Sequence, residues 1–154
     1  MLNDLLGQLG FKSKQIADLL EFNPQIEDVT IEDIQERIKI LKAVFGDEKQ
    51  LRFAIETNPM LLTVSTETML TNLKLLTTLK LLKEELNYII DGNPYVLSYP
   101  TDVIEANISY LSKQGYSQDE IGEFFEAQPY LLTQGVTDED IDDYFNPDID
   151  EDEI

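Results

Sequence analysis

Apolar and polar positions along the chain recur with a period of 35 residues. The period is marked by a proline that follows Asn or Gln, at positions 24, 59, 94 and 129. Four further positions stay apolar in every copy, at 18, 8 and 4 residues before the proline and 2 residues after it. Columns that stay apolar at one fixed period indicate a tandem repeat. The repeat units are expected over residues 1–29, 30–64, 65–99 and 100–135.

Each unit is predicted to contain two helices and a short turn. In the second unit, Thr30 is a good N-cap, and the apolar stripe after it predicts a helix over about 31–44. Gly46 suits a left-handed position after this helix, and Asp47 is expected to cap the next one. Pro59 ends the second helix because proline has no backbone N–H to donate. The apolar residues beyond it predict a short 3₁₀ or irregular turn.

The other units follow this plan with some departures. Thr101 is expected to cap the first helix of the fourth unit, and Gly115-Tyr116-Ser117 forms its turn. In the third unit, Lys80-Leu81-Leu82-Lys83 replaces a Gly/Ser turn, so its two helices are expected to be fused or joined less sharply. A truncated first helix is expected over 1–10 and a short terminal helix over 138–145.

Units of this kind bury their apolar faces only against neighbouring units. The predicted fold class is therefore all-α, an α-solenoid of four 35-residue helix-turn-helix repeats, with a compact helical bundle as the alternative. The repeats and an acidic C-terminal cap over 136–145 are expected to form a single domain over 1–145. The acidic tail 146–154 is expected to be disordered.

The composition excludes several classes of site. The chain has no Cys and no His, so it cannot form a disulfide, a thiolate zinc site, a Ser-His-Asp triad or a histidine-ligated metal centre. A glycine-rich phosphate loop is also missing, so a non-catalytic protein without a cofactor is expected. The N-terminal residues lack the cationic segment of a targeting signal, and no apolar run is long enough to span a membrane, so a cytoplasmic location is expected.

The charge is strongly negative and unevenly distributed. The chain has 11 Lys and Arg against 31 Asp and Glu, a net charge of −20, and half of this lies in the last 19 residues. Helical spacing places Asp119, Glu123 and Glu126 on one face. We interpret the acidic C-terminal third as a surface that binds a basic protein, such as a nucleic-acid-binding enzyme, and that can mimic a nucleic-acid backbone. The residues assigned to this surface are Asp119, Glu120, Glu123, Glu126, Asp138, Glu139, Asp140, Asp142 and Asp143.

Two other interpretations of the acidity stay open. A terminal repeat needs a polar outer face, so the acidic end can serve as a solubilising cap. The alternation of Asp148, Asp150 and Asp152 resembles the start of an EF-hand calcium loop, although the glycine and the bidentate glutamate of that loop are missing.

Parts of several units share a Gly-aromatic-Ser turn, a second amphipathic helix and a proline followed by leucine. The clearest segments are Leu9-Gly10-Phe11-Lys12-Ser13 with Asn23-Pro24, Asn58-Pro59-Met60-Leu61-Leu62, and Gly115-Tyr116-Ser117 with Pro129-Tyr130-Leu131-Leu132. Over residues 2–135 this pattern resembles the repeat of the mitochondrial transcription termination factor (mTERF) family. The resemblance implies a curved solenoid of units with two α-helices and a short third turn. It also implies a basic concave surface that binds double-stranded nucleic acid.

That resemblance gives an alternative function, a nucleic-acid-binding regulator of transcription or RNA. Eight of the 11 basic residues lie in the two central units and form the candidate patch for this role. They are Arg37, Lys39, Lys42, Lys49, Arg52, Lys74, Lys80 and Lys83.

Overall fold

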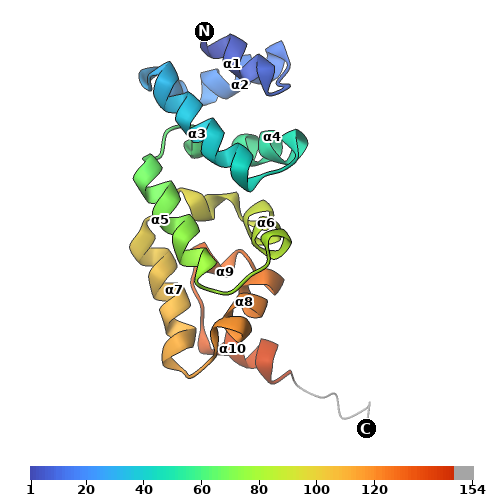
Figure 1. Ribbon diagram of the computed structural model, residues 1–154, viewed down its shortest axis with the longest axis vertical. Helices are drawn as coiled ribbons and strands as arrows, with labels where there is room; N and C mark the ends of the chain where they lie inside the picture. The colour runs from blue at the N-terminus through green and yellow to red at the C-terminus, as the bar shows by residue number, and fades with distance from the viewer. Residues whose placement is uncertain (148–154) are drawn as a thin grey trace.

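A computed structural model describes residues 1–147, which stack as helices along one long axis (Figure 1). This part of the chain contains ten α-helices and three 3₁₀ turns, and it has no strand. The α-helices are α1 (Leu2–Gln8), α2 (Ser13–Phe22), α3 (Ile31–Val44), α4 (Glu48–Thr57), α5 (Thr66–Thr77), α6 (Lys83–Gly92), α7 (Thr101–Lys113), α8 (Gln118–Ala127), α9 (Leu131–Gln134) and α10 (Asp138–Phe145). The 3₁₀ turns are η1 (Pro24–Asp28), η2 (Pro59–Leu62) and η3 (Pro94–Leu97). None of the described helices is both long and apolar enough to cross a membrane.

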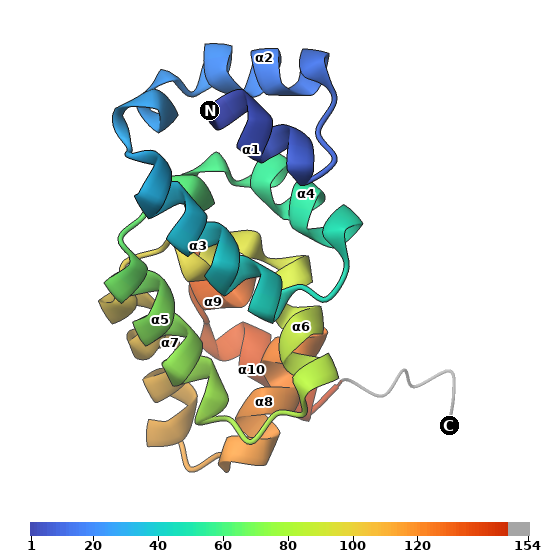
Figure 2. The same ribbon diagram turned by 45° about the horizontal axis from the view of Figure 1, so that its top comes forward.

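The helices form two layers (Figures 1 and 2). The first helices α3, α5 and α7 lie on one side, and the second helices α4, α6 and α8 lie on the other. In the last two complete units α5 packs along α7, and α6 packs along α8. The short segment after each proline packs on the first helix of its own unit: η2 on α3, η3 on α5 and α9 on α7. The predicted α-solenoid is confirmed, and the helical-bundle alternative is wrong.

The apolar columns of the repeat form the core. The column 18 residues before the proline is 0% exposed in all four units, and the column two residues after it is at most 3% exposed. These residues are Leu6, Leu41, Leu76 and Leu111, and Ile26, Leu61, Val96 and Leu131. Burial of each such side chain stabilises the fold by roughly 1.5–3 kcal/mol. The 35-residue period of the sequence therefore reflects the burial of equivalent apolar side chains in every unit.

Two N-caps of the second unit are confirmed. Thr30 Oγ1 accepts a hydrogen bond from the N–H of Asp33 at 3.2 Å, and α3 covers the predicted residues. Asp47 Oδ1 accepts from the N–H of Lys49 at 2.8 Å and begins α4. Local capping chemistry was sufficient here because both caps are exposed and have no competing tertiary partner.

The prediction that Thr101 caps α7 is wrong. Pro100 occupies the N-cap position, and Thr101 is the first residue of the helix. The hydroxyl of Thr101 donates instead to Oδ1 of the buried Asn72 at 2.7 Å. A tertiary partner has therefore taken the side chain away from its local capping role.

A residue in the left-handed region follows the first helix in three units. Gly10, Lys80 and Gly115 have φ angles of 95°, 55° and 94° and stand at equivalent positions of the repeat. The left-handed assignment of Gly46 is wrong, because φ at that residue is not positive and the equivalent residue, Phe45, is extended with φ −98°. Lys80 also corrects the expectation for the third unit, since its helices are separate and joined by a turn of the same shape.

One polar column ties the first helices α3, α5 and α7 to the turns of their own units. Arg37, Asn72 and Asn107 stand one period apart and occupy equivalent positions on α3, α5 and α7. Each donates side-chain N–H groups to backbone carbonyls in or next to the segment that follows the proline, at 2.6–2.8 Å. These bonds satisfy carbonyl groups that would otherwise be buried without a partner.

A second polar column ties the second helices α4 and α6 to the preceding unit. Arg52 and Asn87 donate to carbonyls near the end of the preceding first helix, at 2.8 and 2.9 Å. These acceptors, one period apart, are the carbonyls of Leu9 and Val44. Gly122 holds the same position in the fourth unit, where an added Cβ would lie 3.0 Å from the carbonyl oxygen of Leu79. The fourth unit thus packs backbone against backbone where the others use a side chain.

The terminal helix α10 packs on the fourth unit through its apolar side. Ile141 is 4% exposed. The ring of Phe145 stacks on Tyr116 with centroids 4.1 Å apart, and Tyr144 meets Phe124 edge-on at 5.4 Å. This aromatic cluster fixes α10 beside α8.

Candidate functional site

The two arginines of the predicted nucleic-acid patch are used by the fold. Arg37 is 9% exposed, and its guanidinium donates to the carbonyls of Val64 at 2.6 Å and Asp33 at 2.8 Å. The guanidinium of Arg52 donates to the carbonyl of Leu9 at 2.8 Å. Arginine recognises phosphate through a free, planar fork of N–H groups. Arg37 already uses Nε and Nη1 to bond backbone carbonyls, and Arg52 uses Nη1, so neither guanidinium is wholly free for a phosphate in this conformation.

The other six residues of that patch are lysines with exposed side chains. They lie on α3 and α5 and around the turns that lead into α4 and α6. We call them the lysine edge: Lys39, Lys42, Lys49, Lys74, Lys80 and Lys83. Within residues 1–147 the sole ion pair joins the N-terminal ammonium to Asp4 at 3.6 Å, so the lysine edge carries ammonium groups without a carboxylate partner.

Some of the predicted acidic residues have structural partners. Glu120 and Asp140 each accept from the backbone N–H of the N-cap residue of their own helix, at 3.0 and 2.9 Å. Asp138 accepts a short hydrogen bond from the hydroxyl of Tyr110. Capping explains the first two carboxylates without a ligand, since acids in the first turn stabilise a helix N-terminus.

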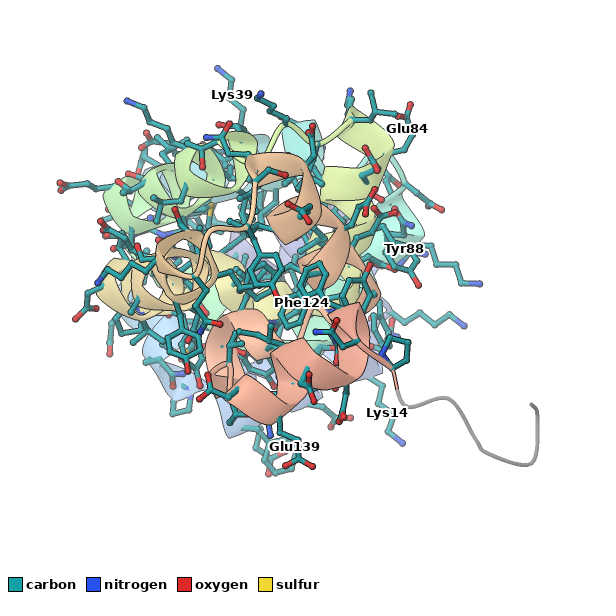
Figure 3. All side chains as sticks on the ribbon, turned by 90° about the horizontal axis from the view of Figure 1, so that it is seen from below. Lys14, Lys39, Glu84, Tyr88, Phe124 and Glu139 are labelled. Atoms are coloured by element: carbon teal, nitrogen blue, oxygen red, sulfur yellow. The ribbon has the colours of Figure 1, made fainter. Side chains whose placement is uncertain are left out.

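The acidic residues of α10 lie apart from those of α8. Figure 3 shows Glu139 on a different side of the molecule from Glu84 and Tyr88. Asp138, Glu139 and Asp142 line a hollow near Tyr116, whereas Glu123 and Glu126 line another hollow with Tyr88 and Tyr144. Asp143 is exposed. The structure therefore divides the predicted acidic surface into two parts.

The part on α8 continues onto α6. Glu123 and Glu126 face a groove between these helices, together with Tyr88 of α6. Glu84 and Asp91 occupy on α6 the positions that Asp119 and Glu126 occupy on α8, one period later. We call this set the acidic face: Glu84, Glu85, Asp91, Asp119, Glu123 and Glu126.

One contact across the acidic face joins two carboxyl groups. Between the first two units, Gln15 Nε2 donates to Glu56 Oε1 at 3.1 Å. The equivalent residues two periods later are Glu85 and Glu126. Burial, the hydrogen bond with Glu85 and the charge of nearby carboxylates raise the pKa of Glu126. Burial, followed by the charges of Glu123 and Glu126, also raises the pKa of the Tyr144 hydroxyl.

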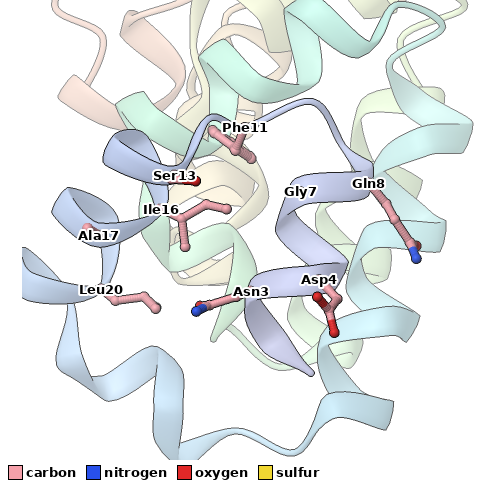
Figure 4. A pocket seen from close by; sticks show the side chains of 9 residues that line it. All are labelled: Asn3, Asp4, Gly7, Gln8, Phe11, Ser13, Ile16, Ala17 and Leu20. Carbon is pink, nitrogen blue, oxygen red and sulfur yellow. The ribbon is translucent and has the colours of Figure 1, made fainter.

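A hollow between α1 and α2 lies at the other end of the solenoid (Figure 4). Asp4 is the one ionisable side chain among the residues that line it. Its carboxylate lies 3.6 Å from the N-terminal ammonium. A single paired carboxylate does not supply the two groups that general acid–base catalysis uses.

The described residues also lack a metal centre. In residues 1–147 no group of three or more acidic side chains is arranged to hold a metal ion. The calcium hypothesis rests on Asp148, Asp150 and Asp152, which lie outside the described residues. Most of the expected tail, 146–154, lies outside them as well.

Comparison with protein families gives one assignment. The family model for mTERF matches residues 1–140. The chain belongs to the mTERF family. No curated protein matches it. The resemblance stated from the repeat motifs is therefore confirmed, and the match runs past residue 135 into the start of α10.

As an mTERF repeat protein, this chain carries functional candidates that local reading of the sequence missed. Glu84, Glu85 and Asp91 were not assigned to the acidic surface because that surface was placed where acidic residues are most frequent along the chain, in the C-terminal third. The available signal was the mTERF period itself. Glu84 lies one period before Asp119, and Asp91 lies one period before Glu126.

Proposed function

We propose that this mTERF-family protein is a non-catalytic binding scaffold whose acidic face engages a basic protein, such as a nucleic-acid-binding protein or enzyme. The observation that carries the proposal is the contact between Glu85 of α6 and Glu126 of α8, beside a groove that Glu123 and Glu126 line with Tyr88. Among residues 1–147 none of the six forms an ion pair with Lys or Arg. The groove therefore carries negative charge that the protein itself leaves uncompensated.

A basic partner supplies the compensating charge. Burial, followed by the hydrogen bond with Glu85 and repulsion from the charges of Glu85 and Glu123, raises the pKa of Glu126. A Lys or Arg side chain placed in the groove relieves this repulsion and forms charge-assisted hydrogen bonds. Carboxylates three and four residues apart on a helix are about 5–6 Å apart at their Cβ atoms. This spacing is comparable to that of phosphates, so a cationic nucleic-acid groove is a suitable partner surface.

The test removes charge from the acidic face without changing side-chain size. The variant combines Asp119→Asn, Glu123→Gln and Glu126→Gln, and its binding to a panel of purified basic nucleic-acid-binding domains is measured by calorimetry at 150 mM salt. At least tenfold weaker binding is expected, because three of the six carboxylates of the acidic face are lost.

A matched variant removes the same charge from the first helices. Glu32, Glu36 and Glu105 are exposed on α3 and α7, and their replacement by Gln is expected to leave affinity within about twofold of wild type. A third variant lacks residues 146–154, which carry five carboxylates. Equal losses in both triple variants would mean that net charge alone governs binding, and the proposal would then be abandoned.

A second candidate is nucleic-acid binding through the lysine edge. Membership of the mTERF family and six ammonium groups without ion-pair partners favour it. Against it stand the net charge of −20 and the engagement of both arginines in the fold. A salt titration of binding to double-stranded DNA and RNA tests it. Affinity that persists near physiological salt, falls steeply at higher salt and decreases in Lys39→Gln and Lys74→Gln would favour this function over a protein partner.

A further inference from the structure

Large apolar side chains are exposed at equivalent positions of successive units. Phe53 on α4 and Tyr88 on α6 stand one period apart and are 59% and 62% exposed. The residue after the repeat proline is also large and exposed in three units, at 41–51%. With Phe22 at the end of α2, these side chains form what we call the apolar row: Phe22, Phe53, Met60, Tyr88, Tyr95 and Tyr130. Single exposed apolar residues are common, but a repeated series on one layer of a solenoid marks an interaction surface.

Contacts between units place the residues that follow the prolines beside the second helices. The hydroxyl of Tyr95 donates to the carbonyl of Thr57, at the end of α4, at 2.9 Å. Phe22 and Pro59 line one groove between α2 and η2, and Met60 follows this proline directly. The residue after each proline thus lies at the end of the preceding second helix. The row therefore follows the layer of second helices.

An acidic column accompanies the apolar row. The residue three positions before each repeat proline is acidic in all four units, namely Glu21, Glu56, Asp91 and Glu126. Glu56 shares a groove with Phe22, and Glu126 shares a groove with Tyr88. The surface thus alternates carboxylates with aromatic rings along its length.

We propose that the apolar row and the acidic column together dock an amphipathic basic helix of a protein partner. This inference rests on the proposed function and gives its partner a chemistry. Such a helix presents one apolar stripe and one cationic stripe side by side, which match the row and the column. The rings of Tyr88, Tyr95 and Tyr130 also attract a Lys or Arg through their faces. Exposed aromatic side chains of this kind act as the anchors of interfaces.

Charge selects this occupant over the others. A second copy of the chain, also at −20, would bring acidic column against acidic surface. A nucleic acid would place phosphates against the same carboxylates. A basic helix alone satisfies both the apolar and the acidic groups of this surface.

The probe is an 18-residue helical peptide with Lys on one face and Leu at helical spacing on the other. Its fluorescence anisotropy is measured against the full chain at 150 mM salt. A second peptide with Ser in place of Leu has the same charge and is expected to bind at least tenfold more weakly. The variant Phe53→Ala/Tyr88→Ala is expected to weaken binding of the Leu peptide about tenfold, because two anchors are removed. Leu70→Ala is the matched control, since Leu70 is 50% exposed on α5, in the other layer, and it is expected to leave affinity unchanged.

The outcomes separate this inference from the proposed function. If the double alanine variant binds the Leu peptide as wild type does, while the Asn/Gln variant of the acidic face does not, the apolar row has no role and the inference fails alone. If neither variant weakens binding, both fail. A concentration-dependent dimer in sedimentation that the double alanine variant abolishes would make a second copy the occupant and overturn the inference. Unchanged helical circular dichroism in each variant shows that folding is not the cause.

Discussion

Replacement of Asn72 by Leu tests whether the buried polar column stabilises the solenoid. Asn72 is 0% exposed. Its amide donates to the carbonyls of Val96 and Tyr99, both at 2.8 Å, and its oxygen accepts from the hydroxyl of Thr101 at 2.7 Å. Leucine fills similar space and leaves these three groups without that partner. Three unsatisfied groups at about 1–3 kcal/mol each would together cost about 3–9 kcal/mol, and because two of them lie nearer the surface and regain some hydration, we expect a loss at the lower end, about 3–4 kcal/mol.

The loss is large against the total stability of roughly 5–15 kcal/mol typical of a folded domain. For a chain of this size it corresponds to a decrease in Tm of roughly 6–16 °C. Urea unfolding followed by circular dichroism at 222 nm measures it, provided that the dependence on urea concentration is the same in both proteins. The expected change is a lower midpoint at unchanged slope.

The equivalent residue one period later supplies the control. Asn107 is half-buried and makes a single hydrogen bond, to the carbonyl of Leu132 at 2.8 Å, so Asn107→Leu is expected to cost about 1 kcal/mol. A double-mutant cycle of Asn72→Leu with Thr101→Val is expected to show a coupling of about 1 kcal/mol. An Asn72→Leu loss no greater than that of Asn107→Leu would refute the reasoning, because the count of buried bonds would then not set the cost.

Three further predictions concern single positions. Lys80→Gly is expected to stabilise the protein by about 0.5–1 kcal/mol in urea unfolding, because Lys80 has φ 55° and glycine adopts this region without strain; a loss of stability would contradict this. Gly122→Ala is expected to lower stability by about 1 kcal/mol despite the higher helix propensity of alanine, because the new Cβ lies 3.0 Å from the carbonyl oxygen of Leu79. Glu85→Gln is expected to lower the pKa of Glu126, which ¹³C NMR titration of the carboxyl group measures directly. Because the pKa of Glu126 is raised in the folded state, its contribution to stability is present below the ordinary pKa of 4.5 and is lost as pH rises through the folded pKa. Glu85→Gln is therefore expected to reduce this loss of stability above pH 4.5. An unchanged dependence of stability on pH would count against the Glu85–Glu126 pairing.

The repeat could be recognised from the sequence because its signal is repeated. The apolar columns occur four times, so an error in one unit does not obscure the pattern, and the helix over 31–44 follows from local caps and spacing. Family membership also followed from the turn and proline motifs. These features depend on interactions between residues that are close in sequence, or on interactions that recur in every unit.

Features that depend on tertiary partners were not predictable in the same way. Thr101 has the chemistry of an N-cap, but the amide of Asn72, 29 residues away, takes its hydroxyl. In three units the repeat register sets which residue of the turn is left-handed, so Lys80 has a positive φ at the position equivalent to Gly10 and Gly115. Gly46 lies one position beyond that column, and its φ is not positive. Alignment of the four units is what identifies the left-handed residue of a turn.

The candidate sites show the same limit. A sequence presents Arg37 and Arg52 as charges, and nothing local reveals that backbone carbonyls hold their guanidinium groups. Their column neighbours do reveal it, since the polar Asn72 and Asn87 stand at the equivalent positions. A polar residue repeated at buried positions indicates a structural tie, whereas a charge at an exposed position is the better candidate for binding a ligand.

The second polar column gives the solenoid a direction. The carbonyl of Leu9 is bonded by Arg52, and that of Val44 by Asn87, in each case from 43 residues further along the chain. The first helices of the first two units are therefore each completed by the unit that comes after and not by the one before. During synthesis on the ribosome, a unit would emerge in full before the donor that completes it. Truncation from the C-terminal side would then uncap the unit that becomes last, whereas removal of the first unit would leave behind only a guanidinium that water can hydrate.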